Sequence, residues 1–115
     1  MIQDGRYTLV YNNGEYRTLQ VETGKDDFAG KVILSLKIGP GQSWKDYKGC
    51  GFLTPENKIN FWKSFKANNS PERLAKIQAA VDRIVRNPKE AGMAFAMQSG
   101  RCCRCGRELT VPASI

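Results

Sequence analysis

The stretch RYTLVYNNGEYRTLQVE, residues 6–22, consists of two strand-like segments around a turn sequence. Residues 6–11 and 15–22 favour β-strands, and Asn12-Asn13-Gly14 between them tolerates the positive φ angles of a tight hairpin turn. Successive strand side chains point to opposite faces, so one face of the first strand should carry Tyr7, Leu9 and Tyr11 and the other Thr8 and Val10. The stretch therefore predicts a β-hairpin at the start of an antiparallel sheet.

Two further strands are expected downstream. Residues 31–38 (KVILSLKI) are rich in β-branched side chains and are closed by Gly39-Pro40-Gly41. Residues 49–54 (GCGFLT) are the next candidate.

The segment PENKINFWKSF, residues 55–65, fits two structures. The spacing of Ile59, Trp62 and Phe65 suits a helix, whereas the alternation of Ile59 and Phe61 with polar residues suits a strand after a Pro-Glu-Asn turn. We favour the hairpin.

A long helix is expected between Ser70 and Asn87. Ser70 is the N-cap, Pro71 occupies the first helical position, and Glu72 complements the helix dipole. Asn87-Pro88 ends the helix, because proline disfavours the α conformation of the residue before it. The apolar stripe has helical spacing and comprises Leu74, Ile77, Val81, Ile84 and Val85.

The last regular element is predicted from residues 92–98 (GMAFAMQ), whose large and small side chains alternate as in a strand. The predicted class is therefore α+β: a twisted antiparallel sheet of about five to six strands, with one long helix packed on it. We expect this domain to span residues 1–98 and a C-terminal cysteine knuckle to occupy residues 99–115.

The positive charge is concentrated in the second half of the chain. The net charge is +7, and all of the excess of Lys and Arg lies in residues 58–115. A one-sided excess favours a basic surface for nucleic acid or for an acidic protein, although a solvated surface without a partner is the alternative. The candidate binding residues are Lys63, Lys66, Arg73, Lys76, Arg83, Arg86, Arg101, Arg104 and Arg107.

Aromatic residues interleaved with these and other cations also suggest nucleic-acid binding, since rings on a sheet can stack on bases. The alternative is that these rings belong to the core. They are Tyr7, Tyr11, Tyr16, Trp44, Tyr47 and Trp62.

No enzyme class is indicated. The chain has no histidine, P-loop, dinucleotide fingerprint or nucleophile-elbow motif, so we expect neither catalysis nor a small-molecule substrate. Asp26-Asp27 lies in a glycine-flanked turn and is expected to be a solvated loop. The chain also lacks an apolar run of about 18 residues and a secretory leader, so we expect a cytoplasmic protein without membrane contact.

The cysteines suggest an incomplete metal site. Cys102 and Cys105, followed by Gly106, have the spacing of half a zinc knuckle, whereas structural zinc takes four ligands. Cys50 and Cys103 could complete the set, but adjacent cysteines rarely bind one ion comfortably. We therefore prefer Cys50 as a small buried residue, with zinc as a cofactor of an incomplete site.

The C-terminal residues resemble the signature of a family of unknown function from phages, prophages and mobile elements. The matching residues are Ser99-Gly100-Arg101-Cys102, Cys105-Gly106-Arg107, Leu109-Thr110 and Pro112-x-Ser114-Ile115. The resemblance extends to the upstream sheet and helix. It implies a zinc-ribbon-like tail in which Cys102 and Cys105 are ligands and Cys103 is a bystander. The family signature continues with a Gly-x-Gly-Pro-x-Cys element after the Ser-Ile pair. Either the sequence is cut before this element or this member has lost it, and in both cases we expect residues 99–115 to be a truncated knuckle.

These observations lead to a functional hypothesis. We expect a small, non-enzymatic phage or mobile-element protein, in the cytoplasm of a bacterial host, that engages nucleic acid or a nucleoprotein complex through its basic C-terminal half. The alternative is a counter-defence inhibitor of the anti-CRISPR type, bound to a host nuclease. A redox or metal-sensing role is a third hypothesis.

Overall fold

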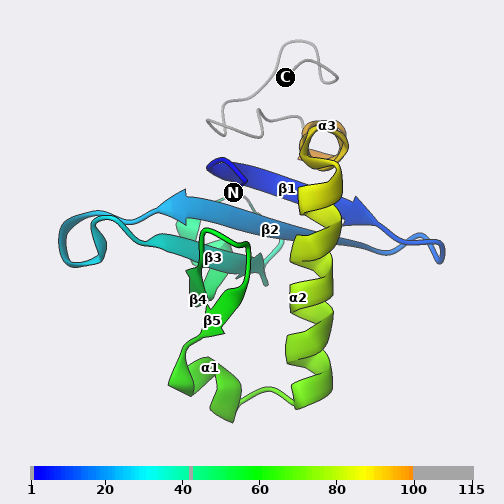
Figure 1. Ribbon diagram of the computed structural model, residues 1–115. Coiled ribbons are helices and arrows are strands. Elements are labelled where there is room, and N and C mark those ends of the chain that lie inside the picture. Colours follow the sequence, from blue (N-terminus) through cyan, green and yellow to red (C-terminus); the bar gives the residue numbers. More distant parts are fainter. Residues whose placement is uncertain (1, 42, 100–115) are drawn as a thin grey trace.

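The computed structural model describes residues 2–41 and 43–99. In this part of the chain, five strands form one antiparallel sheet with the order β1-β2-β3-β4-β5, accompanied by helices (Figure 1). The predicted α+β class is confirmed. The elements are β1 (Gly5–Val10), β2 (Tyr16–Thr23), η1 (Asp26–Phe28), β3 (Val32–Lys37), η2 (Trp44–Asp46), β4 (Tyr47–Leu53), β5 (Ile59–Phe61), α1 (Lys63–Ala67), α2 (Pro71–Arg86) and α3 (Pro88–Ser99).

The β1–β2 hairpin forms at the predicted turn. The backbone N–H of Tyr11 donates to the carbonyl of Glu15 at 2.8 Å, and that of Gly14 donates to the carbonyl of Tyr11 at 3.0 Å. Gly14 has φ +86°, which glycine adopts without steric penalty. Because β1 ends at Val10, Tyr11 lies in the turn and is exposed, whereas Tyr7 and Leu9 are buried in the strand.

The favoured hairpin in residues 55–65 is also confirmed. The backbone N–H of Thr54 donates to the carbonyl of Lys58 at 2.8 Å, and Asn57 adopts φ +63° in the turn. β5 follows and pairs with β4. The helical alternative applies only to the end of the segment, where α1 begins after Trp62.

α2 has the predicted boundaries. The Ser70 hydroxyl accepts a hydrogen bond from the backbone N–H of Arg73 at 3.2 Å, and Pro71 is the first helical residue. The helix lies across one face of the sheet (Figure 1) and, with the strands, encloses the hydrophobic core. Core residues include Leu19, Val21, Leu34 and Leu36 from the sheet and Ile77, Ala80, Val81 and Ile84 from α2.

The strand predicted at residues 92–98 is wrong, because these residues belong to the helix α3. Phe95 is 1% exposed, but Met93 and Met97 are exposed, so alternate residues do not share a face. The buried residues recur with helical spacing instead: Ala91, Gly92, Phe95 and Ala96. The prediction of one long helix is corrected accordingly, since a 12-residue helix follows α2.

α3 packs against β1, the first strand of the sheet, and crosses it: Figure 1 shows the helix end-on and the strand lengthwise. Small buried residues on α3 allow the helix axis to approach the strand closely. The predicted knuckle at residues 99–115 lies, beyond Ser99, outside the described residues. Across residues 2–41 and 43–99, none of the helices combines the length and apolar character needed to cross a bilayer.

A candidate polyanion-binding groove

The two flanks of α2 differ in charge. Four basic side chains predicted to bind a partner lie on the flank that faces the β1–β2 hairpin, and all four are exposed: Arg73, Lys76, Arg83 and Arg86. The opposite flank carries Gln78 and Asp82, and Gln78 contacts the start of β5. Helical spacing explains the separation, because these two sets fall on different sides of the buried stripe.

A groove of about 790 Å³ lies between the basic flank and the hairpin. α2 forms one wall, and the turn region of the hairpin, from Tyr11 to Arg17, contributes to the other. Apolar side chains from both layers contribute to its lining: Leu19, Leu36, Ile77 and Ala80. These four side chains are buried, so the groove combines a charged wall with a floor formed by the edge of the hydrophobic core.

Arg17 adds a fifth cation to the groove. Its register partner on β1 is Leu9, which places Arg17 on the sheet face that α2 covers. Arg17 is not among the binding residues predicted from the sequence. The alternation of Arg17 with Leu19 and Val21 in one strand was the available signal, since residues two apart share a face.

Arg83 has a structural role in addition to its charge. Its guanidinium donates a hydrogen bond to the carbonyl of Val10 at 2.9 Å and lies 5.4 Å from the ring centroid of Tyr11. These contacts tie α2 to the end of β1 and to the turn. Of the five groove cations, Arg83 is the only one held by such contacts within the described residues.

The groove has an excess of positive charge. Two carboxylates, Glu15 and Glu72, line it together with the five cations. The side chains of Arg17, Arg73, Lys76 and Arg86 are exposed and are therefore free to meet an anion. A concave surface lined by one sign of charge raises the local concentration of oppositely charged ligands.

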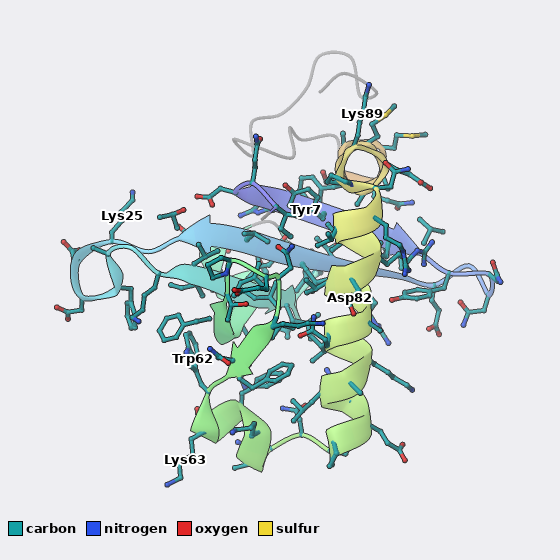
Figure 2. The ribbon with its side chains drawn as sticks, in the orientation of Figure 1. Tyr7, Lys25, Trp62, Lys63, Asp82 and Lys89 are labelled. Atoms are coloured by element: carbon teal, nitrogen blue, oxygen red, sulfur yellow. The ribbon has the colours of Figure 1, made fainter. Side chains whose placement is uncertain are left out.

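The other predicted cations lie elsewhere. Lys63 and Lys66 belong to α1 and do not line the groove. Figure 2 shows Lys63 pointing away from the body of the molecule at the α1 end. Predicted residues beyond Ser99 lie outside the described part of the chain: Arg101, Arg104, Arg107, Cys102 and Cys105.

Cys50 is buried, as predicted. Its thiol donates to the carbonyl of Lys48 at 3.6 Å, and burial raises the pKa of the thiol to about 11. Metal binding needs a thiolate, which this environment disfavours. Within residues 2–41 and 43–99, no three His, Cys, Asp or Glu side chains are grouped to hold a metal.

The predicted aromatic side chains differ in their burial, and that of Trp44 lies outside the part that the structure describes. Tyr7 and Tyr47 are buried, so they match the core alternative rather than base stacking. Trp62 is half-buried and packs edge-on against Phe52, with ring centroids 5.4 Å apart. Tyr11 and Tyr16 are exposed, and of these two only Tyr11 lines the groove.

Comparison with known proteins identifies one match. Residues 92–115 match the model of a family of unknown function, DUF6011. This region includes most of α3 and the cysteine cluster, but not the groove. No curated protein and no solved structure matches the chain.

Proposed function

We propose that this protein is a non-enzymatic nucleic-acid-binding protein and that its ligand occupies the groove between α2 and the β1–β2 hairpin. The observation that carries the proposal is the convergence of five cations, against two carboxylates, on one concave surface. Exposed Lys and Arg side chains are the usual partners of phosphate oxygens. The lack of a histidine and of catalytic motifs favours binding over catalysis.

A salt series measured by fluorescence anisotropy tests this proposal. Each phosphate neutralised by a cation releases condensed counterions, so the affinity should fall with a log–log slope of roughly −0.7 to −0.9 per contact. Three to four contacts would give a slope of about −3. Absence of binding to DNA and RNA, single- and double-stranded, even at low salt would refute the proposal.

A matched pair of charge reversals locates the surface. Arg73→Glu/Lys76→Glu reverses two groove cations, whereas Lys63→Glu/Lys66→Glu reverses two cations on α1. The change in net charge is the same in both variants. The groove variant should lose most of the affinity, and equal losses would mean that net charge alone drives binding.

In the counter-defence alternative, the same groove cations bind an acidic surface of a host nuclease. It is favoured if the protein protects phage in cells carrying a CRISPR system and the groove variant does not, while the purified protein binds no nucleic acid.

The zinc knuckle at Cys102 and Cys105 remains a separate prediction. Less than about one zinc per two chains by mass spectrometry would argue against it.

A further inference from the structure

Tyr11 lies at the rim of the groove with its ring partly open to solvent. The side chain is 38% exposed, although the Arg83 guanidinium lies over the ring. Arg83 is anchored in turn by its hydrogen bond to the carbonyl of Val10. The ring is therefore held by a fixed cation, and its exposed part remains available to a ligand.

Charged and aromatic side chains lie on different sides of the groove. Arg73, Lys76 and Arg86 place charge along the α2 wall, whereas Tyr11 contributes an aromatic ring on the hairpin side. Between them the groove is closed by core side chains such as Leu36 and Ile77, which are 9% and 6% exposed. A duplex presents phosphates outward and keeps its bases stacked inside, so it would leave the exposed ring of Tyr11 unused. A single strand exposes phosphates and bases together.

We propose that the ligand of the groove is a single strand of nucleic acid, with one base stacked on Tyr11 and the flanking phosphates on the α2 cations. This inference rests on the proposed function and narrows it to one ligand class. Arg83 then acts as a positioning residue, because it holds the ring and ties the hairpin to α2. Stacking tolerates any base, so the site selects the single-stranded form more than a sequence.

The test compares a fluorescein-labelled 12-nucleotide oligothymidine with a 12-base-pair duplex at matched salt. The single strand should bind at least tenfold more tightly. Tyr11→Ala should weaken its binding by about 5- to 150-fold, the usual effect of removing one stacking ring. Tyr11→Phe should retain the affinity, because it keeps the ring.

Tyr16→Ala is the matched control. Tyr16 is 52% exposed but does not line the groove, so its removal should leave the affinity unchanged. Far-ultraviolet circular dichroism checks that both alanine variants are folded. Because the turn hydrogen bonds of Tyr11 come from its backbone, the substitution leaves them available.

The outcomes separate the two proposals. Binding of neither oligonucleotide overturns both the proposed function and this inference. Binding that depends on Arg73 and Lys76 but is equal for duplex and single strand, or is unaffected by Tyr11→Ala, overturns the inference alone. A loss of affinity in Tyr16→Ala equal to that in Tyr11→Ala also overturns it, because stacking would then not be specific to the groove.

Discussion

The side chains and backbones of Asn87 and Glu90 cap the start of α3 together. The Asn87 side-chain amide donates to the Glu90 carboxylate at 2.9 Å, and its oxygen accepts from the backbone N–H of Glu90 at 3.3 Å. Asn87 also closes α2, since its backbone N–H donates to the carbonyl of Ile84 at 3.1 Å. One residue therefore ends the helix that carries the basic flank and begins the helix that covers β1.

Asn87→Ala should lower the free energy of unfolding by about 1 kcal/mol, the usual effect of losing an N-cap. Asn87→Ser should retain most of the stability, because its hydroxyl oxygen also accepts from the backbone N–H of Glu90 and places no second carboxylate beside the Glu90 side chain. Urea denaturation followed by circular dichroism measures both. Lys89→Ala, an exposed change in the same turn, is the control; a loss as large as that of Asn87→Ala would contradict a capping role.

Gln78 joins α2 to the β4–β5 hairpin. Its side-chain oxygen accepts from the backbone N–H of Ile59 at 2.9 Å, and its amide donates to the carbonyl of Asn57 at 3.0 Å. Gln78→Ala leaves these partly buried groups without their partner and should lower the free energy of unfolding by about 1–3 kcal/mol. Lys76→Ala, on the exposed flank of the same helix, should change it by less than about 0.5 kcal/mol. Chemical denaturation of both variants checks the difference.

Thr8 and Thr18 form a buried hydroxyl pair with an oxygen–oxygen distance of 2.8 Å. Replacing either one by valine should destabilise the protein by about 1–3 kcal/mol, because the remaining hydroxyl loses its buried partner. The double variant Thr8→Val/Thr18→Val should lose less than the sum of the single variants. A double-mutant cycle measures this coupling, and simple additivity of the losses would show that the pair is not coupled.

Cys50 should react slowly with thiol reagents in the folded protein. Burial raises its pKa from 9.0 to about 11, so the reactive thiolate is scarce at pH 8. Iodoacetamide labelling of a Cys102→Ser/Cys103→Ser/Cys105→Ser variant isolates this thiol. The labelling rate should rise when denaturant unfolds the chain, and fast labelling of the native state at pH 8 would contradict the burial.

The same shift makes stability depend on alkaline pH. The folded state holds the thiol proton more tightly than the unfolded state, so the contribution of Cys50 is complete below about pH 9 and is lost as the pH rises toward 11. Adding Cys50→Ala to the variant that lacks the other three cysteines removes the pH-dependent contribution of the Cys50 thiol to stability. The free energies of unfolding of the two proteins should converge as the pH rises from 9 to 11, as urea denaturation at each pH would show.

The hairpins and α2 could be predicted because their signals are local. The Asn12-Asn13-Gly14 turn and the Ser70-Pro71 helix start act within a few residues, and each forms where it was expected. At Asn87-Pro88 the local signal predicted the end of α2 but not the start of α3. This dipeptide was interpreted only as a helix stop, although an asparagine before a proline, with a glutamate three residues later, is also an N-terminal cap.

The candidate site was predicted in part. The basic flank of α2 followed from helical spacing, whereas the contribution of Arg17 depends on strand register and on the packing of α2 over β2. Lys63 and Lys66 are close to α2 in sequence, but a separate helix carries them. Closeness in sequence to α2 therefore does not show whether a basic residue lines the groove, because the turn between α1 and α2 sets the relative directions of the two helices.

The sequence by itself determined the five strands in their order, the boundaries of α2 and the charge asymmetry of the second half, because propensity, capping and charge are properties of short segments. The short helix α1 was not among the expected elements. Only the tertiary structure decided that residues 92–98 form a helix, since the alternation of large and small side chains predicted a strand, whereas the neighbouring residues Phe95 and Ala96 are both buried in the fold. It also decided the groove, in which cations from α2 and β2 and the ring of Tyr11 come together from segments more than 50 residues apart. Such a surface arises from packing, which no short segment encodes.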